Sequence, residues 1–287
     1  MVSNYSIFIG ICLLNPTINN VGMGLQKLAI NNIPAAGNRS RKSTYALVWT
    51  LGLALQGSVV VLGAKALTIG NASTLGGFAG FGLIALAAFS HLALKERILK
   101  RELFGMATII AGTAALGFFS NGHQSGIADF EQARMTAFLI ACGAVAAAAV
   151  FLMLRDMRAY GGAVLGTLGG AIGGLGMIFM KVVVNRYAKK IGAEGLIIDF
   201  LSDPYTWMTI VGGVGSVVLV QFGYKYGKAI QVVPGFASMV VIMPALAGFI
   251  VLREATTLIC VASLAVITAG VLITTTADRK MKQQAIC

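Results

Sequence analysis

Charged side chains are scarce in this sequence of 287 residues. Asp, Glu, Lys and Arg together make up 11% of it, whereas ordinary globular domains contain about 25%. Hydrophobic residues make up 57%, and the mean hydropathy is +0.84. A soluble protein of this size needs a larger polar shell, so the composition excludes that class. It indicates an integral, multi-pass membrane protein whose partner is the lipid bilayer.

Acidic residues are the scarcest charged group, with 10 Asp and Glu against 22 Lys and Arg, a net charge of +12. In a soluble chain this excess would suggest nucleic acid binding. In a membrane chain it is typical of basic loops on the cytoplasmic face, so no nucleic acid partner is expected.

Residues and motifs of catalytic or metal sites are also missing. The four cysteines form no CxxC pair and the two histidines are isolated, so neither a metal site nor a cofactor is expected. The sequence has no Gly-rich phosphate loop, nucleophile elbow or HExxH motif. We therefore expect no enzymatic activity.

Long apolar runs, by contrast, are abundant. A transmembrane helix needs about 20 mainly apolar residues. This criterion predicts an all-α membrane protein with about nine transmembrane helices, at 5–28, 45–64, 74–94, 102–119, 134–154, 161–184, 206–224, 232–252 and 256–276. The connection 185–205 is one of the two longest and is predicted to hold a short amphipathic segment.

The basic residues predict the orientation. With nine spans, 15 of the 22 Lys and Arg fall on the side that holds the C-terminus and 7 on the other. The positive-inside bias therefore places the C-terminus in the cytoplasm and the N-terminus outside, in a plasma or inner membrane.

Two parts of the chain resemble each other. At an offset of 158 residues the only two tryptophans, Trp49 and Trp207, align, and at an offset of 154 Lys27 aligns with Lys181. Matches at 158 also include Gly57-Ser58-Val59-Val60 with Gly215-Ser216-Val217-Val218, and Gly77-Phe78-Ala79 with Gly235-Phe236-Ala237. These matches predict a duplication.

The predicted organisation is a four-helix repeat in 1–120, a linker with the fifth helix in 121–159, and a second four-helix repeat with a short tail in 160–287. Because five crossings separate the starts of the two repeats, they enter the membrane with opposite orientation. Such 4+1+4 inverted repeats are common in secondary transporters, where the solute site lies near the membrane midplane.

Corresponding helix interruptions are the best sequence pointer to such a site. The predicted helix-break or gating residues are Pro16, Gly22, Gly169, Gly170, Gly173, Gly174, Gly176 and Pro234. The predicted substrate-binding residues are polar groups of the spans: Asn15, Thr17, Asn19, Asn20, Lys27, Gln56, Lys181, Gln221 and Tyr224.

Each group has a structural alternative. Glycines at every fourth residue of 161–184 are typical of close helix packing, which we favour there. The two lysines lie near helix ends, so we favour side chains that extend to the membrane interface. The asparagines are interpreted as the lining of a polar pathway, with interhelical hydrogen bonds as the alternative. For Gln56, Gln221 and Tyr224, hydrogen bonding within the core is an equal alternative. No Asp or Glu lies in the middle of a span, which argues against the simplest proton-coupled mechanism.

Glu96 and Glu254 end corresponding helices, each directly after a basic residue. We predict a structural role for both, as ion pairs at helix termini. Leu94-Lys95-Glu96 followed by Ala111-Gly112 recurs as Leu252-Arg253-Glu254 and Ala269-Gly270.

With this pattern the chain resembles the drug/metabolite transporter superfamily, whose EamA-like halves close a helix on a glutamate. The nine-span layout and Gly24-Leu25-Gln26-Lys27 are similar to the NIPA-type magnesium transporter branch. The resemblance implies a transporter that moves a small solute by alternating access, with Mg²⁺ as the solute.

The chain also departs from that branch: Leu75-Gly76-Gly77 replaces a Thr/Ser-Pro pair, and the Gln56-Gly57 region replaces an acidic residue. Three alternatives therefore stay open: Mg²⁺, a small polar or anionic metabolite, and a non-transporting membrane subunit. Oligomer formation is compatible with each.

Overall fold

The computed structural model describes residues 2–33, 39–69, 75, 77–119, 132–187, 196–251 and 257–284, and their regular elements are all helices. In chain order these are α1 (Val2–Asn32), α2 (Arg39–Ile69), the 3₁₀ helix η1 (Ala79–Phe81), α4 (Gly82–Leu92), α5 (Lys100–Phe119), α6 (Gln132–Arg155), α7 (Met157–Tyr187), α8 (Leu196–Ser202), α9 (Pro204–Tyr226), α10 (Ala229–Ile250) and α11 (Leu258–Gln284). The prediction of an all-α membrane protein is thereby confirmed at the level of class.

Within the described residues, eight helices are long and apolar enough to cross a membrane. They coincide with eight of the nine predicted spans. The segment predicted at 74–94 differs, because η1 and α4 together cover only Ala79–Leu92. Glycines at 77, 80 and 82 weaken helix formation there, and they let the backbone approach α1 and α5 closely.

The connection predicted to hold a short amphipathic segment contains α8, which directly precedes α9. Asp203 separates the two helices and caps α9: its Oδ1 accepts a hydrogen bond from the Tyr205 N–H at 2.9 Å. Pro204 follows in the first turn, where its missing N–H costs nothing.

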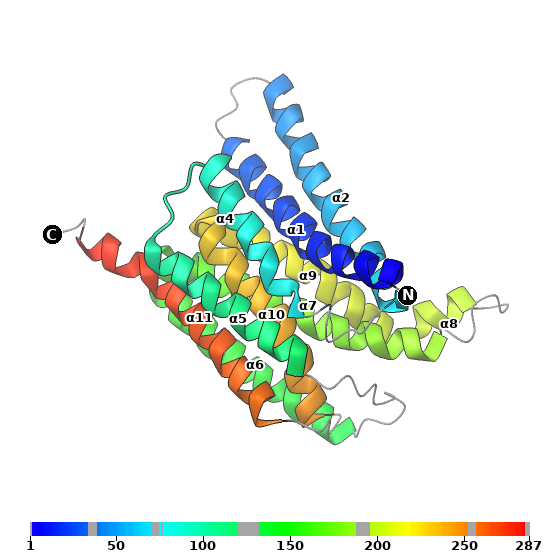
Figure 1. Cartoon of the computed structure of the whole chain (residues 1–287). Coiled ribbons are helices and arrows are strands. Elements are labelled where there is room, and N and C mark those ends of the chain that lie inside the picture. The colour runs from blue at the N-terminus through cyan, green and yellow to red at the C-terminus, as the bar shows by residue number, and fades with distance from the viewer. Residues whose placement is uncertain are drawn as a thin grey trace.

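Most of the helices pack in two similar groups. The pair α5 and α11 forms a further contact between them. α1 lies against α2 and α4, whereas α7 lies against α9 and α10. α5 and α11 run side by side along one flank, as Figure 1 shows. The chain termini lie at opposite ends of the molecule (Figure 1).

Glycines on two faces of α7 explain its close contacts. A Cβ on Gly166 or Gly170 would overlap the backbone oxygens of α10. On the other face, a Cβ on Gly173 would lie 2.7 Å from Ser216 Oγ of α9. The favoured interpretation of these glycines, close helix packing, is confirmed.

The predicted helix interruptions are absent from α1 and α7. α1 continues through Pro16 and Gly22, and α7 continues through the run from Gly169 to Gly176. This part of the prediction is wrong for a physical reason. Packing against neighbouring helices holds the glycines in helical geometry, and Pro16 removes only the one hydrogen bond to the carbonyl four residues before it, while the turns on either side keep α1 continuous. Pro234 also lies inside a continuous helix, α10.

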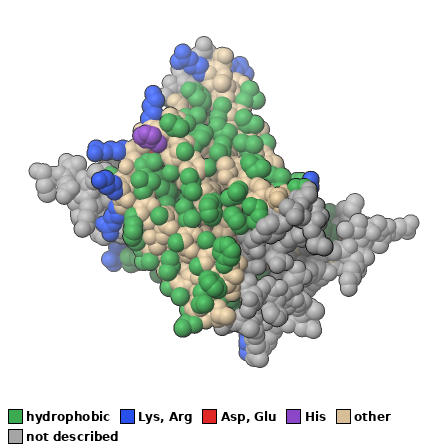
Figure 2. Space-filling view, in the orientation of Figure 1, with side chains coloured by type: hydrophobic (Ala, Val, Ile, Leu, Met, Phe, Trp, Pro, Cys, Tyr) green, Lys and Arg blue, Asp and Glu red, His purple; other side chains and the backbone are tan. Residues whose placement is uncertain are grey.

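The surface is that of a protein surrounded by lipid. On α6, Ile140 is 68% exposed and Val145 70% exposed. Figure 2 shows a broad hydrophobic face, and most of the visible Lys and Arg lie along its upper left border. A continuous apolar surface of this extent marks a membrane contact. The chain is thus an integral, multi-pass membrane protein.

Candidate functional site

A cluster of buried polar side chains lies where the C-terminal parts of α1 and α9 meet. α1 supplies Gln26 and Lys27, and α9 supplies Gln221 and Tyr224. Polar groups in lipid-embedded helices are costly unless they are paired, so each partner in this cluster is informative.

The first part of the cluster is a network of side-chain amides. Gln26, which is 1% exposed, accepts hydrogen bonds at its Oε1 from Gln56 Nε2 at 2.9 Å and Gln221 Nε2 at 2.6 Å. Gln221 Oε1 in turn accepts a hydrogen bond from the indole N–H of Trp49 at 3.2 Å. The network joins α1 and α2 to α9.

The second part is the ammonium group of Lys27. The side chain is 5% exposed and donates hydrogen bonds to the carbonyl oxygens of Tyr224 and, at 2.8 Å, of Gly227. Its Nζ also lies 5.6 Å from the centre of the Tyr224 ring. The last carbonyls of a helix lack intrahelical partners and carry partial negative charge, which a buried cation neutralises.

The favoured interpretation of Lys27, extension to the membrane interface, is therefore wrong, because the end of α9 offers a better partner. Its counterpart Lys181 lies in α7, and its side chain is outside the described residues. Whether the two lysines act alike stays a prediction.

The third part is Glu96, in the segment between α4 and α5. Its Oε1 accepts a hydrogen bond from the Ala229 N–H at 3.1 Å, at the first residue of α10. Burial raises the pKa of this carboxyl group, while the N–H groups of α10 and the charges of Lys27 and Lys228 oppose that rise.

The predicted partner of Glu96 was the preceding lysine, and this is corrected. Lys95 is exposed and has a φ of 54°, a left-handed backbone conformation that turns the following carboxylate toward α10. Glu96 thus has a structural role, but it binds a helix N-terminus of the other predicted repeat. Glu254 lies outside the described residues.

The predicted polar residues in the middle of α1 have partners of their own. Asn15 Nδ2 donates to the Val59 carbonyl of α2 at 3.2 Å, and Thr17 donates to Leu13 within α1. Asn19 Nδ2 lies 3.9 Å from the sulfur of Met23. Asn20 Oδ1 is buried and has no hydrogen-bond partner among the described residues.

The structure does not bring these residues together with Lys27. From Asn15 to Lys27 the helix rises about 18 Å, at 1.5 Å per residue. The predicted site therefore splits into an asparagine group in the middle of α1 and a glutamine–lysine cluster at its end.

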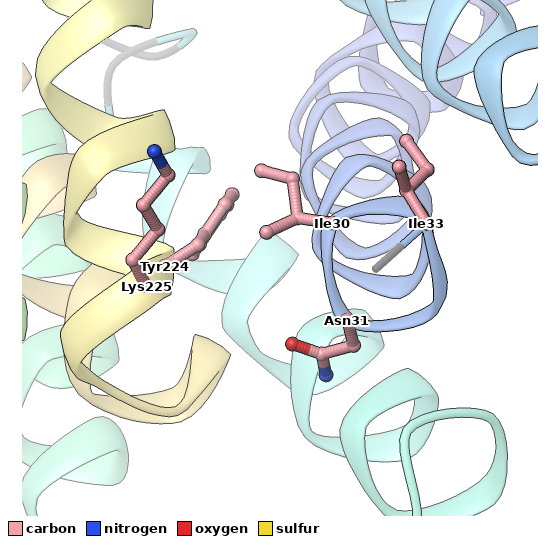
Figure 3. A pocket seen from close by; sticks show the side chains of 5 residues that line it. All are labelled: Ile30, Asn31, Ile33, Tyr224 and Lys225. Atoms are coloured by element: carbon pink, nitrogen blue, oxygen red, sulfur yellow. The ribbon is translucent and has the colours of Figure 1, made fainter. Parts of the chain in front are cut away.

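A cavity of about 460 Å³ opens beside the glutamine–lysine cluster. It is lined by Ile30 and Asn31 of the last turn of α1, by Ile33 just after that helix, and by Tyr224 and Lys225 of α9. Figure 3 shows the two sets of side chains on opposite sides of the gap. A lysine, an amide and isoleucines suit a polar or anionic group that carries an apolar part.

Sequence reasoning missed Gln26 and Trp49 as members of the site. A glutamine beside a predicted span end gives no signal by itself, and its partner Gln221 lies 195 residues away. The alignment of Trp49 with Trp207 also misleads here. Trp207 is exposed and donates to the Leu201 carbonyl, so the two indoles have different roles.

In the part of the chain that the structure describes, no three His, Cys, Asp or Glu side chains lie close enough to hold a metal ion. No protein-family model, curated protein or solved structure matches this chain.

Proposed function

We propose that the chain is a transporter of the drug/metabolite transporter type, built as an inverted repeat, that moves a small solute by alternating access. One observation carries the proposal: polar side chains of the first predicted repeat hold the second across a buried seam. Gln26 bonds to Gln221, Lys27 to the end of α9, and Glu96 to the start of α10.

Reciprocal packing of α5 and α11 supports the repeat. A Cβ on Gly112 would lie 2.7 Å from Ile267, and a Cβ on Gly270 would lie 2.7 Å from Ile109. At the offset of 158 residues Gly112 corresponds to Gly270, and Ile109 to Ile267. Each glycine therefore packs on the isoleucine of the other helix. Two-fold related repeats meet in this way.

The contacts of the two groups also correspond. α1 packs on α2 and α4 as α7 packs on α9 and α10, and these are the equivalent helices of the predicted repeats. The segment with η1 and α4 then counts as the ninth crossing. Phe78 packs near Phe8 of α1, and Glu96 faces Lys27, 19 residues further along that helix.

Hydrogen bonds across the seam suit a gate. A bond between neutral groups contributes about 1 kcal/mol net and one to a charged group about 1.5–3 kcal/mol, because water replaces the partner when the bond breaks. A seam of this kind can separate and rehydrate at lower cost than an apolar contact. We infer that the structure is closed at the end that carries Lys27 and Glu96, next to the cavity of Figure 3.

The charge at this end favours a small polar or anionic metabolite as the solute. Lys225 lines the cavity, and Lys27 bonds to the carbonyl of its neighbour Tyr224. The carboxylate of Glu96, which feels the charge of Lys27, is engaged by α10. Mg²⁺, implied by the resemblance, would have to be held through its waters, amides and carbonyls.

Uptake by the purified chain in proteoliposomes tests the proposal. The panel contains small anionic metabolites, neutral polar metabolites and Mg²⁺, each with empty liposomes as the control. Accumulation of one class supports transport and identifies the solute. No uptake of any class would favour the non-transporting subunit, for which the unpacked Gly143 of α6 offers a helix-docking position.

The asparagine group gives a point test. Asn19 is half-buried, and the hydrogen bond that its amide makes is a weak one to the Met23 sulfur within α1, so Asn19→Leu breaks no bond between helices among the described residues. We expect this change to reduce uptake at least tenfold while membrane expression stays normal, since a polar lining of the path is lost. Unchanged uptake would place the solute path elsewhere.

A further inference from the structure

Glu96 occupies an unusual position for a carboxylate of the seam. It lies in the first predicted repeat, yet its Oε1 accepts the Ala229 N–H of the second at 3.1 Å. Its Oε2 is also buried and has no hydrogen-bond partner among the described residues. A buried carboxylate oxygen without a donor is costly when the group is ionised.

Glu96 is surrounded by charged and titratable groups from several helices and from its own segment. They are Lys27 of α1, Tyr224 of α9 and Lys228 of the turn before α10, with Lys95 and Arg97 next to it in the chain. Lys27, Lys228 and the N–H groups of Ala229 and Ile230 favour the ionised form, whereas burial favours the neutral form.

We propose that Glu96 is a proton-binding site that controls the gate: a proton on its carboxylate stabilises the closed seam, and loss of that proton opens it. The inference rests on the proposed function in that the seam must open during transport. The ligand is a proton from the water at the basic end of the bundle. It neutralises the carboxylate, while Lys27 stays on the carbonyls of α9.

The direction follows from linkage. Burial outweighs the opposing charges and raises the pKa of Glu96 above its ordinary value of 4.5 in the closed state. When the seam opens, the carboxylate meets water and its pKa falls back toward that value. The closed state therefore binds the proton more tightly, so low pH favours closure. As the pH rises through the raised pKa, the closed state loses stability.

The experiment measures the gate directly, without a solute. Spin labels on Asn31→Cys and Lys225→Cys, which lie on opposite sides of the cavity (Figure 3), report the opening in a background whose native cysteines are replaced. The distance between the two spin labels is measured in nanodiscs from about pH 4 to about pH 9. We expect a short distance at low pH and a growing population of a longer distance at high pH.

Two variants assign the response to Glu96. Glu96→Gln keeps an oxygen for the Ala229 N–H but cannot ionise, so it should stay at the short distance throughout. Glu96→Asp keeps a titratable carboxyl group and should retain a pH response with a displaced midpoint. A distance that ignores pH in the parent protein, or a response that survives in Glu96→Gln, overturns the proposal.

Glu102 supplies the matched control. It is a buried carboxylate six residues further on, but its Oε2 accepts the Leu99 N–H at 2.8 Å within its own repeat. Glu102→Gln should leave the pH response of the parent unchanged. If this variant also removes the response, the effect is a general loss of structure and the assignment to Glu96 fails.

The two proposals fail separately. A pH-dependent distance in a protein that takes up no solute would refute the transport proposal and leave the proton site standing. Uptake by a protein whose cavity distance does not depend on pH would refute the proton site and leave the transport proposal standing.

Discussion

At the residue scale, Lys27 shows how one side chain connects helices far apart in the sequence. Its ammonium group donates hydrogen bonds to carbonyls that have no helical partner at the end of α9, about 200 residues further along the chain. The same contact buries a positive charge beside lipid-embedded helices, so its strength depends on each partner remaining in place.

Lys27→Met should destabilise the protein markedly. The change keeps the length of the side chain but leaves the Tyr224 and Gly227 carbonyls without a donor. Hydrogen bonds to charged groups contribute about 1.5–3 kcal/mol, and we expect a loss of that size in the free energy of unfolding in detergent. Lys225→Met, at an exposed position, is the control and should change the stability little. Equal stability of the two variants would contradict a structural role for Lys27.

The sequence allowed Lys27 to be singled out, but it gave no information about the partner. A lysine near a helix end normally reaches water, and only the fold shows that α9 ends opposite it. Glu96 is a similar case: the residue type was noted, while its acceptance of an α10 N–H depends on contact between residues 133 positions apart.

At the element scale, α7 is held by glycines on two faces, and this sets how near its neighbours lie. A Cβ on Gly166 would overlap the Val232 carbonyl oxygen, which belongs to backbone and cannot rotate away. By contrast, a Cβ on Gly143 of α6 would meet nothing within 4 Å.

Gly166→Ala and Gly143→Ala should therefore have opposite effects. We expect the first to lower the free energy of unfolding by about 1–3 kcal/mol through overpacking. The second should raise it by about 0.5–1 kcal/mol, since alanine has less backbone freedom to lose in a helix. Unfolding curves followed by tryptophan fluorescence in micelles measure both. Stabilisation by Gly166→Ala would mean that α7 and α10 do not pack as described.

The positions of the elements were predictable because apolar runs of span length have few alternatives in a membrane. Their ends were less so. α2 begins at Arg39, because the hydrogen bonds of a helix continue past the last apolar residue into the basic segment. The break at Pro16 was predicted from a local rule, whereas a proline removes a single hydrogen bond and the turns on either side of it keep α1 continuous.

At the scale of the whole molecule, the number of crossings decides the sidedness of the termini. Among the described residues eight helices meet the length of a span, and the segment with η1 and α4 is the proposed ninth crossing. If that segment crosses, the termini lie on opposite sides of the membrane, as they lie at opposite ends of the molecule in Figure 1.

Reporters fused to the two ends of the chain distinguish eight membrane crossings from nine. We expect a fluorescent protein fused to the C-terminus to be folded and protected in the cytoplasm, and an N-terminal epitope to be accessible from outside intact cells. Both reporters in the cytoplasm would mean eight crossings, and the inverted orientation of the second repeat would then be lost.

The shortness of η1 and α4 also has a consequence for the surrounding lipid. The 3 residues of η1 and the 11 of α4 extend about 22 Å, at about 2.0 Å and 1.5 Å per residue, whereas the hydrocarbon layer is about 30 Å thick. Ile84 and Leu92 are exposed on this helix, so lipid tails contact it directly. If this segment crosses the membrane, the bilayer must thin beside it to match its length. The voltage of an energised membrane then falls over a shorter path there, and any charge that moves along this flank experiences a steeper electric field.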